Sequence, residues 1–260
     1  MKKSLIFILM ASLVSLFLIN VSVFATETDN RIESSTKDTY VFKTYLKDDD
    51  IKIQSKEGAV TLTGTVSQDS HKSLAGETVS NLPGVKSVDN KLEIKGERPA
   101  ELSDTWILTK VKTTLLFHRS VSGFATNVDV KDGVVTLKGE ATSKAQKDLA
   151  TEYANDVEGV KAVNNVMTVA VAPVKPAGKT TSEKMDDVVE AFDDASITAL
   201  VKTTLLYHRS TSGLKTTVET KEGVVTLSGK AKNVAEKDLA AKLASDVHGV
   251  KSVTNLMTAE

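Results

Sequence analysis

A long internal repeat constrains this chain more than any other feature of its 260 residues. The segment that begins at Asp104 aligns with the segment that begins at Asp194 at a constant offset of 90 positions, and more than half of the aligned residues are identical. At an offset of 75, "EGAVTLTG" from Glu57 also matches "DGVVTLKG" from Asp132. We therefore expect three units, over residues 38–96, 103–171 and 193–260, with linkers over 97–102 and 172–192.

The length of the repeat indicates how the units are built. Solenoid repeats usually span about 20–50 residues and bury their apolar face against a neighbour, whereas these units are longer. Each unit is therefore expected to close its own core. The second linker, "APVKPAGKTTSEKM", is rich in Pro, Lys, Ala and Ser, which is typical of extended, solvated chain. The sequence predicts three separate domains joined as beads on a string.

The first half of unit 2 shows a change of periodicity from helix to hairpin. Ile107, Val111 and Leu115 recur at helical spacing after Ser103, a residue type that favours the helix N-cap. Two alternating segments then flank Lys131-Asp132-Gly133, and an Asp-Gly pair favours the tight turn of a β-hairpin.

A second helix and a third strand complete the unit. Ser143 with Gln146, and Asn233 with Glu236 in unit 3, form capping-box patterns at the start of the helix. The expected buried stripes are Ala145, Leu149, Tyr153 and Val157 in unit 2 and Ala235, Leu239, Leu243 and Val247 in unit 3. The alternating "GVKAVNNVMTV" is then a strand. The predicted fold class is α+β, with two helices on one face of a three-stranded mixed sheet in each αββαβ unit.

The N-terminus carries the pattern of a secretory signal peptide over residues 1–25. Lys2 and Lys3 precede an apolar run from Leu5 to Leu18, and small residues precede the expected cleavage site after Ala25. An uncleaved membrane anchor is the alternative. No later segment is long and apolar enough to span a bilayer, so we expect export to the periplasm without a transmembrane segment after cleavage.

Composition excludes several classes of function. The chain has no cysteine, which excludes disulfides, thiolate metal ligands, a Cys nucleophile and a lipid-modified cysteine. Its formal net charge is −1, and removing the signal peptide with its two lysines leaves −3. Because nucleic-acid binding usually requires a strongly basic patch, we expect no nucleic-acid partner.

Two motifs, repeated in order in all three units, resemble the BON domain family of bacterial envelope proteins. The first is the hairpin glycine motif of "KEGAVTLTG", "KDGVVTLKG" and "KEGVVTLSG", and the second is the Gly-Val-x-x-Val motif of "LPGVKSV", "VEGVKAV" and "VHGVKSV". The resemblance implies an envelope protein of the osmotic stress response, whose domains bind phospholipid surfaces peripherally. Because the sequence shows no catalytic constellation, we expect no enzyme activity and no cofactor. A chaperone-like or scaffolding protein that binds envelope proteins is the alternative.

The most site-like residues are two copies of a His-Arg-Ser sequence, hereafter the HRS segments, each of which follows a predicted helix. They comprise His118, Arg119 and Ser120, and His208, Arg209 and Ser210. Cations and a nearby Gly123 or Gly213 suit the C-terminal end of a helix, which is a purely structural interpretation. Alternatively, the guanidinium with the serine hydroxyls binds a phospholipid headgroup. Unit 1 is expected to lack this segment.

Other candidate residues favour structural roles. His71 and His248 have no metal-ligand partner at helical or loop spacing, and "KDDD" at 47–50 lacks the Gly and Glu of a calcium loop, so no metal site is expected. No sequence pattern indicates a catalytic triad. Six glycines are expected to serve the backbone at turns where a Cβ would clash: Gly58, Gly84, Gly133, Gly159, Gly223 and Gly249.

Overall fold

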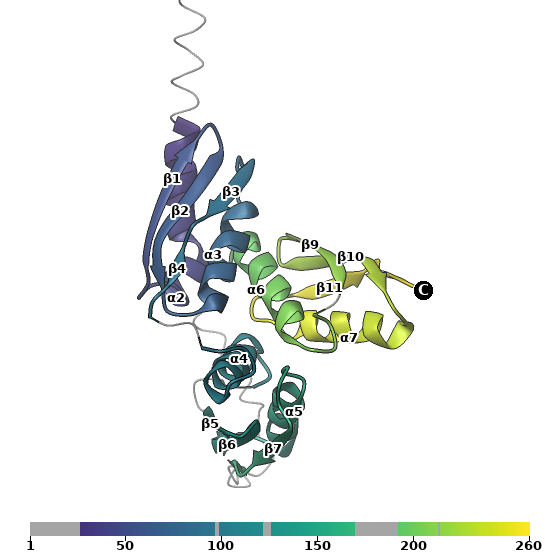
Figure 1. The fold of residues 1–260 in the computed structure, drawn as a ribbon. Helices are drawn as coiled ribbons and strands as arrows, with labels where there is room; N and C mark the ends of the chain where they lie inside the picture. Colours follow the sequence, from purple (N-terminus) through teal and green to yellow (C-terminus); the bar gives the residue numbers. More distant parts are fainter. Residues whose placement is uncertain (1–26, 97–98, 122–125, 170–191, 213) are drawn as a thin grey trace, which may run out of the picture.

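The structure is a computed structural model that describes residues 27–96, 99–121, 126–169, 192–212 and 214–260. These residues form three αββαβ units, each a small mixed sheet with helices packed on one face (Figure 1). This is the α+β fold that the sequence predicts. The expected signal peptide and nearly all of the second linker lie outside the described residues. None of the described helices is both long and apolar enough to cross a membrane.

The elements recur in the same order in each unit. Unit 1 begins with a helix over residues 27–38 and continues with α2 (Tyr40–Thr44), β1 (Asp50–Lys56), β2 (Ala59–Val66), α3 (Asp69–Ser80), β3 (Ser87–Asn90) and β4 (Glu93–Ile94). Unit 2 consists of α4 (Asp104–Phe117), β5 (Thr126–Lys131), β6 (Val134–Ala141), α5 (Lys144–Asn155), β7 (Ala162–Asn165) and β8 (Thr168–Val169). Unit 3 consists of α6 (Asp194–Tyr207), β9 (Lys215–Lys221), β10 (Val224–Ala231), α7 (Val234–Ser245), β11 (Ser252–Asn255) and β12 (Thr258–Ala259).

The second strand of each unit is the centre of its sheet. In unit 2, β6 pairs antiparallel with β5 and parallel with β7 and β8. The last strand is interrupted because the side chain of Asn165 turns back, donating to the Lys147 carbonyl of α5 at 2.8 Å. Asn90 and Asn255 donate to the carbonyls of Lys72 and Lys237 in the same way at 2.8 Å. An asparagine thus joins sheet to helix in every unit.

A carboxylate in the first helix holds the hairpin turn in every unit. Asp104 accepts hydrogen bonds from the backbone N–H groups of Asp132 and Gly133, both at 2.8 Å. Asp29 and Asp194 make the same pair of contacts in units 1 and 3. Asp132 and Gly133 have φ of 53° and 79°, so the turn has a left-handed backbone whose N–H groups point toward the helix. The first helix and the hairpin are therefore locked together locally.

Asp29 shows that unit 1 starts before residue 38, where the repeat comparison begins it. The helix over residues 27–38 lies before that boundary and supplies the contact to the hairpin of unit 1. From Asp29 to β1 the spacing equals that from Asp104 to β5 within one residue. The HRS segment is therefore replaced in unit 1 by residues 43–45, rather than missing as the sequence analysis expected.

The three units are packed together, which contradicts the expectation of separate beads. Their buried apolar side chains form one continuous cluster. Helix α6 lies at its centre: α3 of unit 1 and α4 of unit 2 both pack against it, and most of its residues are buried. Its buried residues include threonines and a serine as well as apolar side chains. Units 1 and 2 both contribute to the burial of α6, so the three units share one core.

Candidate functional site: a reciprocal joint between units 2 and 3

The two HRS segments lie where α4 and α6 end, and both turn toward the other unit. His118 and His208 are the C-cap residues, with extended backbone angles that stop each helix. After His208, the hydroxyl of Thr211 donates to the carbonyl of Leu205 at 2.7 Å and so satisfies one of the last helical carbonyls. Both histidine side chains are 0% exposed. The segments therefore lie at the ends of their helices, at a buried contact between the two units.

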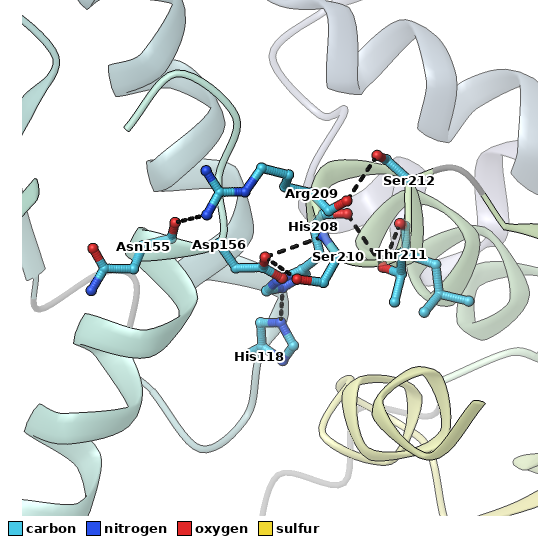
Figure 2. A network of polar contacts seen from close by, with 9 residues as sticks. His118, Asn155, Asp156, His208, Arg209, Ser210, Thr211 and Ser212 are labelled. Atoms are coloured by element: carbon cyan, nitrogen blue, oxygen red, sulfur yellow. Dashed lines mark hydrogen bonds and ion pairs between the residues drawn. The ribbon is translucent and has the colours of Figure 1, made fainter. Parts of the chain in front are cut away.

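The backbone contact between the two units is the same in both directions. The N–H of Arg209 donates to the Asp156 carbonyl at 2.7 Å (Figure 2). In the other direction, the N–H of Arg119 donates to the Asp246 carbonyl at 2.8 Å. Asp156 and Asp246 are the C-cap residues of α5 and α7. The isolated bridges His118 with Val247 and Val157 with His208 repeat the exchange. Each unit gives a segment and receives one, so we call this contact the reciprocal joint.

The acceptor in each half of the joint is the aspartate carboxylate. Asp156 accepts from the N–H of Ser210 at 3.2 Å and from its hydroxyl at 2.5 Å, and lies 3.0 Å from Nδ1 of His208. Asp246 accepts from the N–H of Ser120 at 3.2 Å and from its hydroxyl. Its carboxylate lies 3.2 Å from Nδ1 of His118. A hydroxyl, an amide and an imidazole therefore converge on one carboxylate in both halves.

Tyr153 makes the two halves differ. Its hydroxyl donates to Asp246 at 2.7 Å, and its ring stacks on His118 with the ring centroids 3.9 Å apart. The equivalent position in unit 3 is Leu243, which has no hydroxyl to donate to Asp156. Burial, reinforced by the Asp246 carboxylate, raises the pKa of Tyr153 well above its ordinary value, so its proton stays in place.

The two histidines meet at the centre of the joint. Nε2 of His118 lies 2.9 Å from Nε2 of His208, which is hydrogen-bond distance (Figure 2). Burial lowers the pKa of His118, although Asp246 acts in the opposite direction. Burial alone raises the pKa of Asp156 and Asp246, but the donors around each carboxylate outweigh it and hold both pKa values below the ordinary value.

The two arginines lie at the rim of the joint. Arg119 donates from its guanidinium to the Val250 carbonyl at 3.0 Å, and Arg209 donates to the Asn155 carbonyl at 3.2 Å. The Arg119 side chain is 50% exposed. Both arginines therefore bridge the units on one side and face solvent on the other. Ser122, Gly123 and Gly213 lie outside the described residues.

Unit 1 lacks both halves of this contact. Asn81 is the C-cap of α3, at the position of Asp156 and Asp246. In unit 1, Asp49 accepts from the N–H of Ser67 at 2.8 Å and lies 2.5 Å from Nδ1 of His71. The Ser67 hydroxyl also lies 3.0 Å from Nδ1 of His71. Because Asp49 and Ser67 share one ring nitrogen, they do not form the relay of a catalytic triad.

The remaining sequence candidates lie outside the joint or support it. The six singled-out glycines all have positive φ, between 78° and 90°. His248 lies beside the joint, where its backbone N–H donates to the Phe117 carbonyl at 3.3 Å. Across the described ranges, no three His, Asp or Glu side chains are grouped so that they could hold a metal ion. Asp156, Tyr153 and Asp246, the partners of the HRS segments, were not among the candidate site residues predicted from the sequence.

A cavity of about 490 Å³ lies where the three units meet. It is lined by the start of α3, by Trp106 and Lys110 of α4, and by Tyr207 of α6. The Lys110 ammonium occupies the space between two rings, 4.4 Å from the centroid of Trp106 and 4.5 Å from that of Tyr207. This arrangement fastens unit 2 to unit 3 through cation–π contacts.

Comparisons with known proteins place the chain in a family. It is 31% identical over 205 residues to the osmotically-inducible protein Y of Escherichia coli, covering 79% of this chain and 95% of that protein. It is 29% identical over 147 residues to the outer membrane lipoprotein DolP of Haemophilus influenzae, covering 54% and 76%. It is 32% identical over 120 residues to a 21 kDa hemolysin of Actinobacillus pleuropneumoniae, covering 45% and 61%.

The family comparison agrees with the three structural units. The BON domain profile matches residues 28–96, 103–171 and 193–260. Its first match includes the helix over residues 27–38 that carries Asp29. The repeat, the αββαβ topology and these three matches together show that the chain belongs to the BON domain family.

Proposed function

We propose that this chain is a non-enzymatic periplasmic protein of the osmotic and envelope stress response that binds the surface of anionic phospholipid membranes. Its relatives include an osmotically-inducible protein and an outer membrane lipoprotein, which supports the envelope role. The signal-peptide pattern of residues 1–25 supports export to the periplasm. The lipid contact itself is supported by one feature of the surface.

That feature is an exposed apolar side chain at the same position in units 2 and 3. Val166 is 50% exposed and Leu256 is 62% exposed, and both follow the asparagine that interrupts the last strand. The bonds from Asn165 and Asn255 to the second helix hold these loops firmly. In unit 1 the equivalent residue is Lys91. We call these two loops the apolar tips.

Two exposed lysines, each 3.7 Å from a glutamate, and a further apolar side chain lie on the elements next to the apolar tip of unit 3. Val234 is 63% exposed at the start of α7, one turn before Lys237, whose carbonyl binds Asn255. Lys230, on the strand that pairs with β12, and Lys232 have side chains that are 75% and 77% exposed. Apolar side chains beside lysines suit the boundary between lipid headgroups and acyl chains, and each lysine adds about 1 kcal/mol near an anionic membrane.

The HRS segments are a second place for the same function. In the closed joint His118 and His208 are buried, so a headgroup could contact only the outer face of Arg119 and Arg209 with the adjacent serines. A planar guanidinium suits a phosphate. The apolar tips and the arginines are different residues with different side-chain chemistry, so each pair can be substituted without changing the other.

Vesicle sedimentation tests this proposal with phosphatidylglycerol and phosphatidylcholine vesicles at low and physiological salt. We expect the full chain to pellet with phosphatidylglycerol, and the double change Val166→Ser with Leu256→Ser to weaken binding by about tenfold or more, because two apolar side chains lose their burial in lipid. Leu206→Ser, at a residue that is 52% exposed outside the tips, is the matched control. Equal and negligible pelleting with both lipids would refute the proposal.

Two further outcomes assign the contact. If Arg119→Ala with Arg209→Ala abolishes pelleting and the tip variant does not, the HRS segments are the lipid site. The alternative function, a chaperone-like protein or scaffold, is favoured by the edge strands β1, β5 and β9, which each pair on one side only and can receive a client strand. Suppression of aggregation of an unfolded envelope protein without lipid, by a chain that binds neither vesicle, would favour that alternative.

A further inference from the structure

The reciprocal joint contains a pair of histidines that share one hydrogen. Nδ1 of His208 is hydrogen-bonded to the Asp156 carboxylate at 3.0 Å and carries a hydrogen, whereas Nδ1 of His118 lies 3.2 Å from Asp246 with no hydrogen bond. The two Nε2 atoms lie 2.9 Å apart, which requires one hydrogen between them. One ring therefore donates from Nε2 and the other accepts.

The pair depends on a single hydrogen between the two rings. When both rings are fully protonated, two N–H groups and two positive rings face each other at 2.9 Å inside the protein. Two like charges at this distance repel strongly when water is excluded. The closed joint therefore does not suit two fully protonated rings.

Charged groups from every packed element face this pair. Asp156 after α5 and Asp246 after α7 are the carboxylates beside the two rings. Arg119 and Arg209 at the rim add positive charge, and the Arg119 side chain lies 3.9 Å from Asp246. His248 also acts on His118 as a like charge when it is protonated. Tyr153 is neutral and covers one ring.

We propose that the reciprocal joint is operated by protons: it is closed when a single hydrogen lies between His118 and His208, and it opens in mild acid, when full protonation of both rings forces them apart. Unit 2 is the part that moves, because α3 and α6 hold units 1 and 3 together without the joint. Its movement also separates α4 from α6 and Lys110 from the ring of Tyr207. Lys202 of α6, which lies 2.8 Å from Glu77 of α3, belongs to the contact between α3 and α6.

The sign of the effect follows from proton uptake. Burial lowers the pKa of His118, so the closed joint binds the additional proton less readily than the open one. The contribution of this residue to closure is complete above about pH 6.5, the ordinary value of a histidine, and is lost as the pH falls below it. One additional proton changes the ratio of open to closed molecules by up to about tenfold per pH unit.

A distance measurement on the full chain tests the joint. The protein has no cysteine, so Lys131→Cys and Lys221→Cys, at exposed positions on the hairpins of units 2 and 3, give one label on each unit. Spin-label or fluorescence distances are recorded between about pH 7.5 and about pH 5. We expect one short distance at neutral pH and a growing population of longer distances below about pH 6.5.

His208→Gln is the decisive variant. The glutamine carbonyl can accept the Nε2 hydrogen of a fully protonated His118 and cannot itself be charged, so this variant should stay closed in mild acid. His71→Gln removes a histidine that pairs with Asp49 outside the joint, and it should open like the unmodified chain. An unmodified chain with the same distances across this pH range would overturn the proposal, and so would a His208→Gln variant that opens at the same pH.

A second measurement does not depend on a variant that folds. The backbone N–H groups of Arg119 and Arg209 donate across the joint. In the unmodified chain, their protection from hydrogen exchange should fall together as the longer distances appear, whereas the N–H of Gly133, bonded to Asp104 within unit 2, should keep its protection. Unchanged protection of both arginine amides at about pH 5 would contradict opening. Vesicle binding plays no part in either measurement, so they stand apart from the proposed function.

Discussion

The backbone N–H of Tyr40 donates to Oδ2 of Asp193 at 2.7 Å, across the contact between units 1 and 3. The same carboxylate accepts from the N–H of Ser196 at 2.8 Å and so caps the start of α6. One side chain therefore both begins the central helix of the molecule and holds α2 of unit 1 against it. The Ser196 hydroxyl adds a second link, because it accepts from the N–H of Val41 at 3.0 Å.

Replacement of Asp193 should weaken the whole molecule. We expect Asp193→Ala to lower the free energy of unfolding by about 1–2 kcal/mol for the lost cap, and by more once unit 1 loses its contact. Asp193→Asn keeps an acceptor for the cap and should lose less. Urea unfolding measures the difference. Asp38→Ala, which removes an exposed partner of Lys43, is the control and should change stability by less than about 1 kcal/mol. Equal losses in the two alanine variants would contradict this role.

Asp246 should matter more to the joint than a surface carboxylate. Asp246→Asn removes the negative charge beside His118 and leaves the donors from Ser120 and Tyr153 with a weaker acceptor. We expect a loss of about 1.5–3 kcal/mol in urea unfolding, the range for hydrogen bonds to charged groups. The control is Asp148→Asn, at an exposed carboxylate that pairs with Lys144, and it should be nearly neutral.

The coupling of Asp246 to His118 can be measured directly. A double-mutant cycle with Asp246→Asn and His118→Gln should give a coupling of about 1 kcal/mol or more, because the two side chains are in contact. Strictly additive losses would show that the imidazole and the carboxylate act independently.

Two buried tyrosines should make the protein sensitive to alkali. Burial raises the pKa of Tyr153 and of Tyr207, and the carboxylates of Asp246 and Asp69 reinforce the two shifts. A raised pKa means that the stabilising contribution is complete below about pH 10, the ordinary value, and is lost as the pH rises above it. Urea unfolding at several alkaline pH values should therefore show falling stability. Tyr153→Phe should be less stable at neutral pH but lose less stability on going to alkaline pH; an unchanged slope would argue against this account.

Gly229 should not tolerate a side chain. Its φ is 128°, and an added Cβ would lie 2.2 Å from the Lys215 carbonyl oxygen of the neighbouring strand. We expect Gly229→Ala to cost about 3 kcal/mol or more in urea unfolding, because strain and a backbone clash combine. Gly96 has φ of 84° with nothing within 4 Å of an added Cβ, so Gly96→Ala should cost only about 1–2 kcal/mol. Similar losses in both variants would show that the positive φ alone, and not the clash with the Lys215 carbonyl, sets the loss of stability.

The sequence predicted most of the structure within each unit, namely its helices, its helix caps and much of its buried face. Periodicity located α4 correctly, since Ile107, Val111 and Leu115 are all buried. The N-caps at Ser103, Ser143 and Asn233 are also as predicted. The second-helix stripe was only half right. Tyr153 and Val157 are buried, but Ala145 is exposed and Ala150 and Ala154 are buried instead. In a helix with 3.6 residues per turn, positions that are always four apart rotate away from the buried face. Positions that are alternately three and four apart stay on it.

The contacts between units could not be read from the repeat in the same way. A comparison of the three units reveals the residues that they share. The packing of α6 depends instead on residues that differ between the units, because α3 and α4 contact it from units 1 and 2. One signal was present in the sequence. The HRS segment and the aspartate of the second helix occur together in units 2 and 3, and both are replaced in unit 1, where Asn81 stands at the aspartate position. Residues that appear and disappear together in copies of a domain indicate a shared contact.

The reciprocity of the joint has a consequence for assembly. A surface that gives and receives the same groups is complementary to a second copy of itself, so a lone unit of this kind would pair with another molecule only at sufficient concentration. Two such units in one chain meet at an effective concentration in the millimolar range. Tandem duplication thus makes the contact intramolecular, so that it forms at any protein concentration, whereas a contact between separate molecules would be lost on dilution.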